Sequence, residues 1–202
     1  MNQKERMLAG LPYKAGMDGL YEERIANKKK IYEFNHLPPA EWGRETELLK
    51  SILGKTGENI HIEAPFHCDY GYNIEVGENF FANYNLVILD VGKVRIGDNA
   101  QIAPNVAIYT AGHPVHPDSR NSGYEYGIPI TIGDNVWIGG NTCIMPGVTI
   151  GNNVVIGAGS VVTKDIPDNV IAVGNPCRVI REITEADREY YYRDRKFDVP
   201  LE

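Results

Sequence analysis

The chain is poor in cysteine and has no long apolar run. Its three cysteines, Cys68, Cys143 and Cys177, stand far apart, and no two of them form a CxxC pair. This pattern argues against a disulfide framework or a structural zinc site and is typical of a reducing compartment. No stretch approaches the roughly 18 apolar residues of a membrane span, and the first residues, MNQKERMLAGLPYKAG, contain no apolar signal region. We therefore expect a cytoplasmic protein that does not bind a membrane.

An excess of positive charge is also lacking. The 202 residues include 20 Lys and Arg against 27 Asp and Glu, which gives a formal net charge of −7. Such a balance argues against a nucleic-acid partner, because nucleic-acid binding relies on cationic surfaces. With 43% hydrophobic and 23% charged residues, the composition otherwise indicates an ordinary globular protein.

What the chain does contain is a six-residue repeat. Ile or Val recurs every six residues from 96 to 108 and again from 132 to 162, and Gly usually follows it. Neither the helical period of 3.6 nor the strand period of 2 explains this spacing. One short strand and one tight turn per hexad do explain it, with the Ile pointing inward and with Gly or Asn at corners of positive φ.

The repeat predicts a mainly β fold, a β-helix of hexapeptide repeats over residues 59–181. Three hexads return the chain over itself, so that parallel strands stack about 4.8 Å apart. Less regular blocks over 62–87 extend the same pattern. Five to six coils about 25 Å tall follow from this spacing.

Helices are expected at both ends of the coil. The N-terminal segment 1–58 contains two helical stretches, over 22–37 and 40–54. A C-terminal helix is predicted over 183–197, within the tail 182–202, because Thr184 and Asp187 have the spacing of a capping box. We expect these helices to cover the two ends of the β-helix.

The repeat stops at a polar excursion over residues 114–129, with His113 directly before it and His116 near its start. A histidine with an ordinary pKa of about 6.5 is mostly neutral at pH 7, and it can then accept a proton as a general base. The residues alone do not decide between these two candidates.

Several motifs in this chain resemble those of the maltose and galactoside O-acetyltransferases, within the hexapeptide acyltransferases. They are CDYGYN, NFFANYN, GHPVHP, RNSGYEYGIPITIG, VTKDIPDN and GNPCRVI, and the similarity extends over essentially the whole chain. The resemblance implies a left-handed parallel β-helix, a homotrimer, and active sites in the clefts between subunits. It further implies acetyl-CoA as co-substrate, a small sugar as acceptor, and no metal.

The resemblance also assigns site residues. It implies that His113 is the catalytic base and that Asn83 and Asp69 contact the acceptor. The residues implied for coenzyme A binding are Gly140, Ala158, Thr163, Lys164, Arg178 and Arg181. Their chemistry is suitable, because Arg presents a planar fork to phosphate, Lys acts as a point charge, and small residues admit an extended ligand arm.

Some assignments remain open at this stage. Glu125 is a candidate for orienting His113, and Trp137 is expected either in the core or against the ligands. The galactoside enzymes carry Asp where this chain has Val91, and a second acceptor-binding Asp of the family falls near Ala15. The sequence therefore favours a maltose or glucose type of acceptor.

Three other functions compete with the transfer of acetyl to such a sugar. The acceptor could be a galactoside or a xenobiotic hydroxyl. A metal enzyme of the γ-carbonic anhydrase type would share the fold, but the HxxxxH pair of that group is missing, since His61 and His67 are six residues apart. A non-catalytic hexapeptide scaffold is the third alternative.

Overall fold

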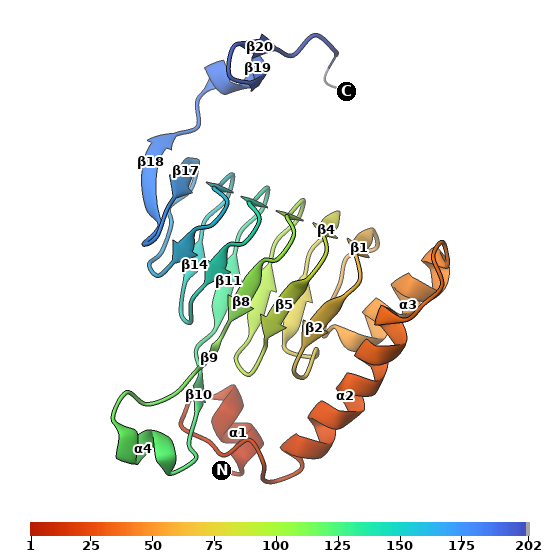
Figure 1. Ribbon diagram of the computed structural model, residues 1–202, viewed down its shortest axis with the longest axis vertical. Coiled ribbons are helices and arrows are strands. Elements are labelled where there is room, and N and C mark those ends of the chain that lie inside the picture. The colour runs from red at the N-terminus through yellow and green to blue at the C-terminus, as the bar shows by residue number, and fades with distance from the viewer. Residues whose placement is uncertain (201–202) are drawn as a thin grey trace.

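The computed structural model describes residues 1–200, in which the chain winds into a left-handed parallel β-helix with three flat faces (Figure 1). The first face consists of β1 (Ile60–Ile62), β4 (Phe80–Ala82), β7 (Gln101–Ile102), β12 (Trp137–Ile138), β15 (Val155–Ile156), β17 (Val170–Val173) and β18 (Arg178–Glu182). The second face consists of β2 (Phe66–Cys68), β5 (Leu86–Leu89), β8 (Ala107–Tyr109), β13 (Cys143–Ile144) and β16 (Val161–Val162). The third face consists of β3 (Ile74–Val76), β6 (Val94–Ile96), β11 (Ile130–Ile132) and β14 (Thr149–Ile150).

The six-residue repeat sets the register between coils. Ile96 pairs with Ile132, and Ile132 pairs with Ile150, so equivalent hexad positions stack directly above one another. All three isoleucines are buried in the single core that runs along the coil axis. The first face has six parallel strands before the antiparallel β18, which confirms the predicted five to six coils.

The corner that joins the third face to the first shows why Gly and Asn follow the inward Ile. At Gly97, a Cβ atom would collide with Oδ1 of Asp134 on the next coil. That carboxylate oxygen accepts the N–H of Asp98, at 2.8 Å. Asn99 has a φ of 57°, a conformation that Asn tolerates better than most residues, and its side-chain amide donates to the Oδ1 of Asn135, at 3.0 Å. The hexad therefore encodes a ladder of hydrogen bonds as well as a core.

The N-terminal helices are confirmed. They are α1 (Gln3–Leu8), α2 (Leu20–Asn35) and α3 (Trp42–Ile52). Helices α2 and α3 cover the first coil, where Phe34 meets Phe66 edge to face with ring centroids 6.5 Å apart. Helix α1 does not cover the coil end. It lies beside the excursion (Figure 1), where Met7 belongs to a second, smaller apolar cluster with Tyr13, Leu20, Tyr70 and Val91.

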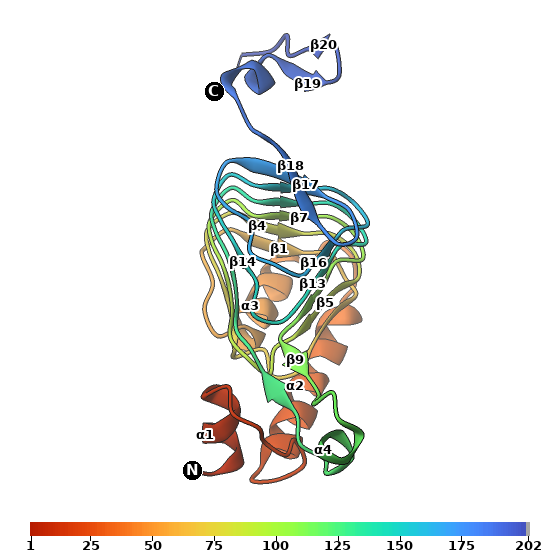
Figure 2. The same cartoon turned by 90° about the vertical axis from the view of Figure 1, so that its left-hand side faces the viewer.

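The predicted C-terminal helix over 183–197 is wrong. The capping box at Thr184 and Asp187 is present, but it opens only a 3-10 turn, Glu185–Arg188. A hairpin of β19 (Tyr190–Tyr192) and β20 (Arg195–Lys196) follows and lies beyond the last coil (Figure 2). The aromatic run of β19 favours a strand over a helix. The antiparallel β18 therefore borders the last coil, and no helix covers it within residues 1–200.

Within residues 1–200, none of the helices combines the length and the apolar character that a bilayer crossing requires.

Candidate active site

The excursion leaves the coil at the corner between the second and third faces, which we call the site corner. Strand β9 (Ala111–Gly112) leads outward and pairs with β10 (Tyr126–Gly127), which leads back to the third face. Helix α4 (Pro117–Asn121) forms the tip of the excursion. The repeat is interrupted here because the chain builds a protruding arm and then resumes in register.

The two histidines of the arm have different environments. His116 caps helix α4, with its Nδ1 accepting the N–H of Asp118 at 3.2 Å. His113 follows β9 directly and is exposed. Within residues 1–200, no protein group forms a hydrogen bond with the His113 ring. The His113 imidazole is therefore available to a ligand, whereas His116 has a structural role.

Glu125 contacts the N-terminal segment. The Tyr13 hydroxyl donates a hydrogen bond to Oε1 of Glu125, and the two backbones exchange N–H···O bonds of 2.9 and 3.0 Å. Tyr13 is fully buried, and burial raises its pKa far above the ordinary value, with the bonded Glu125 adding to the effect. The arm is thereby held by residues from the start of the chain, a contact that the sequence analysis missed.

Asp69 lies at the same corner as the arm, one residue after β2. It is half-buried, and burial is the main reason why its pKa is raised, with Glu125 adding to the rise while Arg24 and Lys28 oppose it. A partly desolvated carboxylate is a strong acceptor for ligand hydroxyl groups. The structure thus brings Asp69 and the base of the arm to one corner.

Thr163 and Lys164 stand at the site corner two coils further along, directly after β16, and both are exposed.

Asn83 stands at a different corner. It follows β4, at the corner between the first and second faces, and its Oδ1 accepts the N–H of Tyr84 at 2.8 Å. Its amide nitrogen remains a donor for a ligand.

Gly140 and Ala158 share the corner of Asn83, which we call the opposite corner. Gly140 follows β12 and Ala158 follows β15, and the Gly159 N–H donates to the Gly140 carbonyl at 2.8 Å. A Cβ at position 140 would approach the Pro104 carbonyl to 3.1 Å, so a side chain is disfavoured here. The predicted residues therefore occupy two edges of the second face rather than one cluster.

Arg178 and Arg181 lie on β18 and are exposed. The Arg181 guanidinium contacts both carboxylate oxygens of Asp187, at 2.7 and 2.8 Å. This pairing holds the Asp187 pKa well below its usual range. Asp187 was predicted only as a helix cap and not as the partner of a predicted phosphate ligand. A separation of six residues matches no local pairing rule, so the sequence offered no signal for this ion pair.

Trp137 is not a core residue. Its side chain points outward from β12 on the first face and is 55% exposed. Of the two expectations for Trp137, core packing is wrong.

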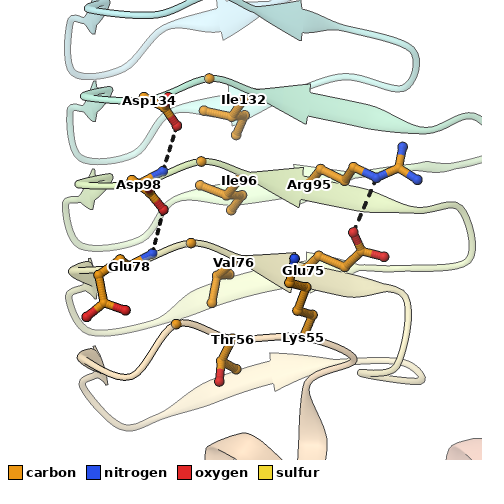
Figure 3. Close-up of a pocket in the computed structure, with 14 residues that line it drawn as sticks. Lys55, Thr56, Glu75, Val76, Glu78, Arg95, Ile96, Asp98, Ile132 and Asp134 are labelled. Carbon is orange, nitrogen blue, oxygen red and sulfur yellow. Dashed lines mark hydrogen bonds and ion pairs between the residues drawn. The ribbon is translucent and has the colours of Figure 1, made fainter.

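A groove extends from the third face onto the corner between the third and first faces (Figure 3), and none of the predicted site residues lines it. Its polar side chains bind one another. Glu75 pairs with Arg95 at 3.3 Å, and Asp98 accepts the N–H of Glu78 at 2.7 Å. The groove is thus explained by the ladder that joins the coils.

Within the described part of the chain, no three or more His, Cys, Asp or Glu side chains are grouped so that they could hold a metal ion. His61, which the metal-enzyme alternative would use, faces Glu45 and Glu63 with N···O distances of 3.4 and 3.1 Å.

Comparison with known proteins agrees with this geometry. The profile of the family described as "Bacterial transferase hexapeptide (six repeats)" matches residues 129–164, and the "Maltose acetyltransferase hexapeptide capping motif" matches residues 6–57. The galactoside O-acetyltransferase of Escherichia coli (strain K12) is 52% identical over 198 residues, which is 98% of each chain.

Two solved structures are similar over almost their full length. A maltose O-acetyltransferase from Clostridium difficile 630 has a TM-score of 0.90 and 57% identity, covering 92% of this chain and 99% of its own. A galactoside acetyltransferase in complex with coenzyme A has a TM-score of 0.95 and 51% identity, covering 98% of this chain and all of its own.

The fold and the protruding arm define a hexapeptide-repeat acyltransferase. Within that class, the chain belongs to the maltose and galactoside O-acetyltransferase family. The family and enzyme class inferred from the sequence are therefore confirmed.

Proposed function

We propose that this enzyme transfers the acetyl group of acetyl-CoA to a hydroxyl group of a small sugar of the glucose or maltose type, with His113 as general base. The observation that carries the proposal is the environment of His113. It is exposed at the base of the arm and is not hydrogen-bonded by any protein group of residues 1–200, whereas His116 is committed to capping α4. The same observations argue against a non-catalytic scaffold, which needs no such histidine.

The reaction is proposed to be direct. A thioester is already activated, so the chain has to supply a base for the sugar hydroxyl proton as the oxygen attacks. Burial raises the pKa of all three cysteine thiols, Cys68, Cys143 and Cys177. A protonated thiol is a poor nucleophile. An acetylated cysteine intermediate is therefore not part of the proposal, and the free thiols fit the cytoplasmic location.

The acceptor type is inferred from the second apolar cluster. Val91 is buried in this cluster and Ala15 packs against it. The resemblance to the galactoside enzymes predicts one Asp at position 91 and a second near Ala15. The nearby Asp18 bonds to the start of α1, with its Oδ2 accepting the Gln3 N–H at 2.7 Å. Asp69 and the amide of Asn83 remain as polar groups for the acceptor.

Coenzyme A is proposed to bind along the residues that the resemblance assigns. Gly140 and Ala158 place no large side chain at the opposite corner, Lys164 adds a positive charge, and Arg178 and Arg181 offer forks for phosphate. The similar galactoside acetyltransferase structure contains coenzyme A, which supports the proposal.

We propose a homotrimer with shared sites, as the resemblance implies, and the separation of the two corners supports more than one copy at each site. The four residues of β5 alone span about 13 Å, whereas reacting atoms must come within about 3.5 Å of each other. Residues at the site corner and at the opposite corner of one chain therefore serve one reaction centre only if a second copy brings the two edges together. The second face between them presents apolar side chains, including Val87, Ala107 and Val161, as a copy-to-copy interface requires. Sedimentation equilibrium should give three times the chain mass of 22.5 kDa.

Thiol release from acetyl-CoA tests the chemistry. We expect release to depend on glucose or maltose more than on a β-thiogalactoside or chloramphenicol. His113→Ala should lower the rate about 10²–10⁴-fold, as loss of a general base does. His116→Ala is the matched control and should retain most of the activity. Activity that survives His113→Ala, or that needs no sugar, would contradict the proposal.

A further inference from the structure

The turn that carries Asp69 is held by a buried carboxylate from the coil above it. Oδ1 of Asp90 accepts the N–H groups of both Asp69 and Tyr70, each at 2.9 Å. The Asn73 side-chain amide closes the same turn from the other end by donating to the Asp90 carbonyl, at 2.7 Å. Asp90 therefore fixes the turn at two points, with its side chain and with its backbone.

The segment around Asp90 also contacts the strand that leads to His113. The hydroxyl of Thr110 donates to the Leu89 carbonyl at 2.6 Å and accepts the Gly92 N–H at 2.8 Å. Thr110 is fully buried and stands three residues before His113. Residues 89–92 are thus hydrogen-bonded on one side to the Asp69 turn and on the other to the base of the catalytic arm.

The buried Asp90 carboxylate holds the turn at a cost in folding free energy. Its side chain is 0% exposed, and its Oδ2 has no partner in hydrogen-bond geometry in the described part of the chain, although the Gly71 N–H also faces the carboxylate. Burial is the main cause that raises its pKa to about 6. The corner between the third and first faces does the same task with Asp98 and Asp134, which lie near the surface and remain hydrated. A buried, half-satisfied carboxylate destabilises the fold, so stability alone does not explain it.

We propose that Asp90 is a positioning residue, which sets the Asp69 turn relative to the arm of His113 so that an acceptor hydroxyl is presented to the base. The inference rests on the proposed function, because it takes Asp69 as an acceptor contact and His113 as the base. Asp90 is buried beneath the turn and acts through Asp69, so it does not contact the acceptor itself.

Asp90→Ala and Asp90→Asn separate this role from others. Alanine removes the acceptor of two N–H groups, whereas asparagine retains an oxygen at the Oδ1 position. We expect Asp90→Ala to lower kcat/KM for the sugar about 10- to 100-fold, the range that misplaced reactants give, with the KM for acetyl-CoA unchanged. Asp90→Asn should restore most of the sugar kcat/KM. Asp98→Ala, which removes one comparable carboxylate-to-backbone bond at a different corner, is the control and should change neither value.

Amide hydrogen exchange provides a readout that needs no substrate. The amides of Asp69 and Tyr70 should exchange faster in Asp90→Ala than in the wild type, and at nearly the wild-type rate in Asp90→Asn. If no sugar gives thiol release with the wild type, the proposed function fails, and this exchange result still decides whether Asp90 holds the turn.

Two results would overturn the positioning role. One is unchanged exchange and unchanged sugar kcat/KM in Asp90→Ala. The other is an equal loss for the sugar and for acetyl-CoA together with a lowered melting temperature, which would mean that Asp90 only supports the fold.

Discussion

The hydroxyl of Tyr13 is hydrogen-bonded to Glu125 across 112 residues of sequence, and this bond joins the start of the chain to the arm that carries His113. The N-terminal segment therefore does more than cover a coil end. Helices α2 and α3 close the β-helix, whereas the segment before them packs its apolar side chains, among them Met7 and Tyr13, beneath the site corner.

Tyr13→Phe should loosen the arm without altering the core. A buried hydrogen bond to a carboxylate contributes about 1.5–3 kcal/mol to the free energy of unfolding. Part of this loss is offset in the variant, because water can hydrogen-bond to the half-buried Glu125 carboxylate. We expect the free energy of unfolding, measured in urea, to fall by about 1–2 kcal/mol, and sugar kcat/KM to fall with it. Tyr21→Phe, at a tyrosine that is 53% exposed, is the control. Equal stability of the two variants would show that the Tyr13 bond is dispensable.

The fold was predictable because the hexad is a local code. The inward direction of each Ile is set by its position within its own strand, and a corner such as that of Gly97 contacts only the next coil. The six-residue period therefore determines the number of coils and their register. The tail was mispredicted because the capping box at Thr184 and Asp187 is equally compatible with a single 3-10 turn. The aromatic run at Tyr190–Tyr192 was the stronger signal.

The site was predictable only in part. The resemblance indicated which residues belong to the site. It did not indicate that Asn83 and His113 stand at different corners, because their placement depends on how the strands are distributed among the three faces. Asp90 was missed, although it lies 21 residues after Asp69, about one coil further along. Tyr13 was not predictable, since nothing local links it to Glu125.

Gly97→Ala tests the corner ladder. The added methyl group would collide with the Asp134 carboxylate and with backbone atoms of Gly133. Overpacking of this kind destabilises a protein by about 1–3 kcal/mol, and thermal unfolding should show it. Gly43→Ala, in the first turn of α3 with open space around it, should instead raise stability slightly, by up to about 0.5 kcal/mol. The same sign for both substitutions would contradict the assignment of steric contact between coils at Gly97.

Asp187→Asn tests the predicted phosphate contact of Arg181. The carboxylate of Asp187 occupies the guanidinium fork and adds negative charge where a phosphate is expected. Exposed ion pairs are weak, so its removal should lower the KM for acetyl-CoA by at most about fivefold. Arg181→Ala should raise that KM, and the sugar KM should change in neither variant. A higher KM for acetyl-CoA in Asp187→Asn would mean that Asp187 orients the guanidinium rather than competing for it.

Asp90 should make the fold less stable as pH rises. Its pKa is about 6 in the folded chain against 3.8 as the ordinary value. Between these two values the folded chain retains a proton that the unfolded chain has lost, so the free energy of unfolding decreases with rising pH through this window and stays lower above it. The full effect of this one group is about 3 kcal/mol.

Asp90→Asn removes that titration, so its stability relative to the wild type should increase as the pH rises from about 4 to 7. Glu45 also has a raised pKa, mainly through burial, but it is independent of Asp90 and cancels in the difference. The Asp69 charge helps to raise the Asp90 pKa, so the difference reports the titration of Asp90 together with its coupling to Asp69. Urea unfolding of wild type and variant at four pH values across this range measures the difference directly. Parallel curves would show that Asp90 is not the titrating group, and a difference that shrinks with rising pH would reverse the sign of its contribution. If the stability of Asp90→Asn relative to the wild type grows with pH, the Asp90 carboxylate that holds the Asp69 turn is charged at neutral pH and destabilises the wild-type fold.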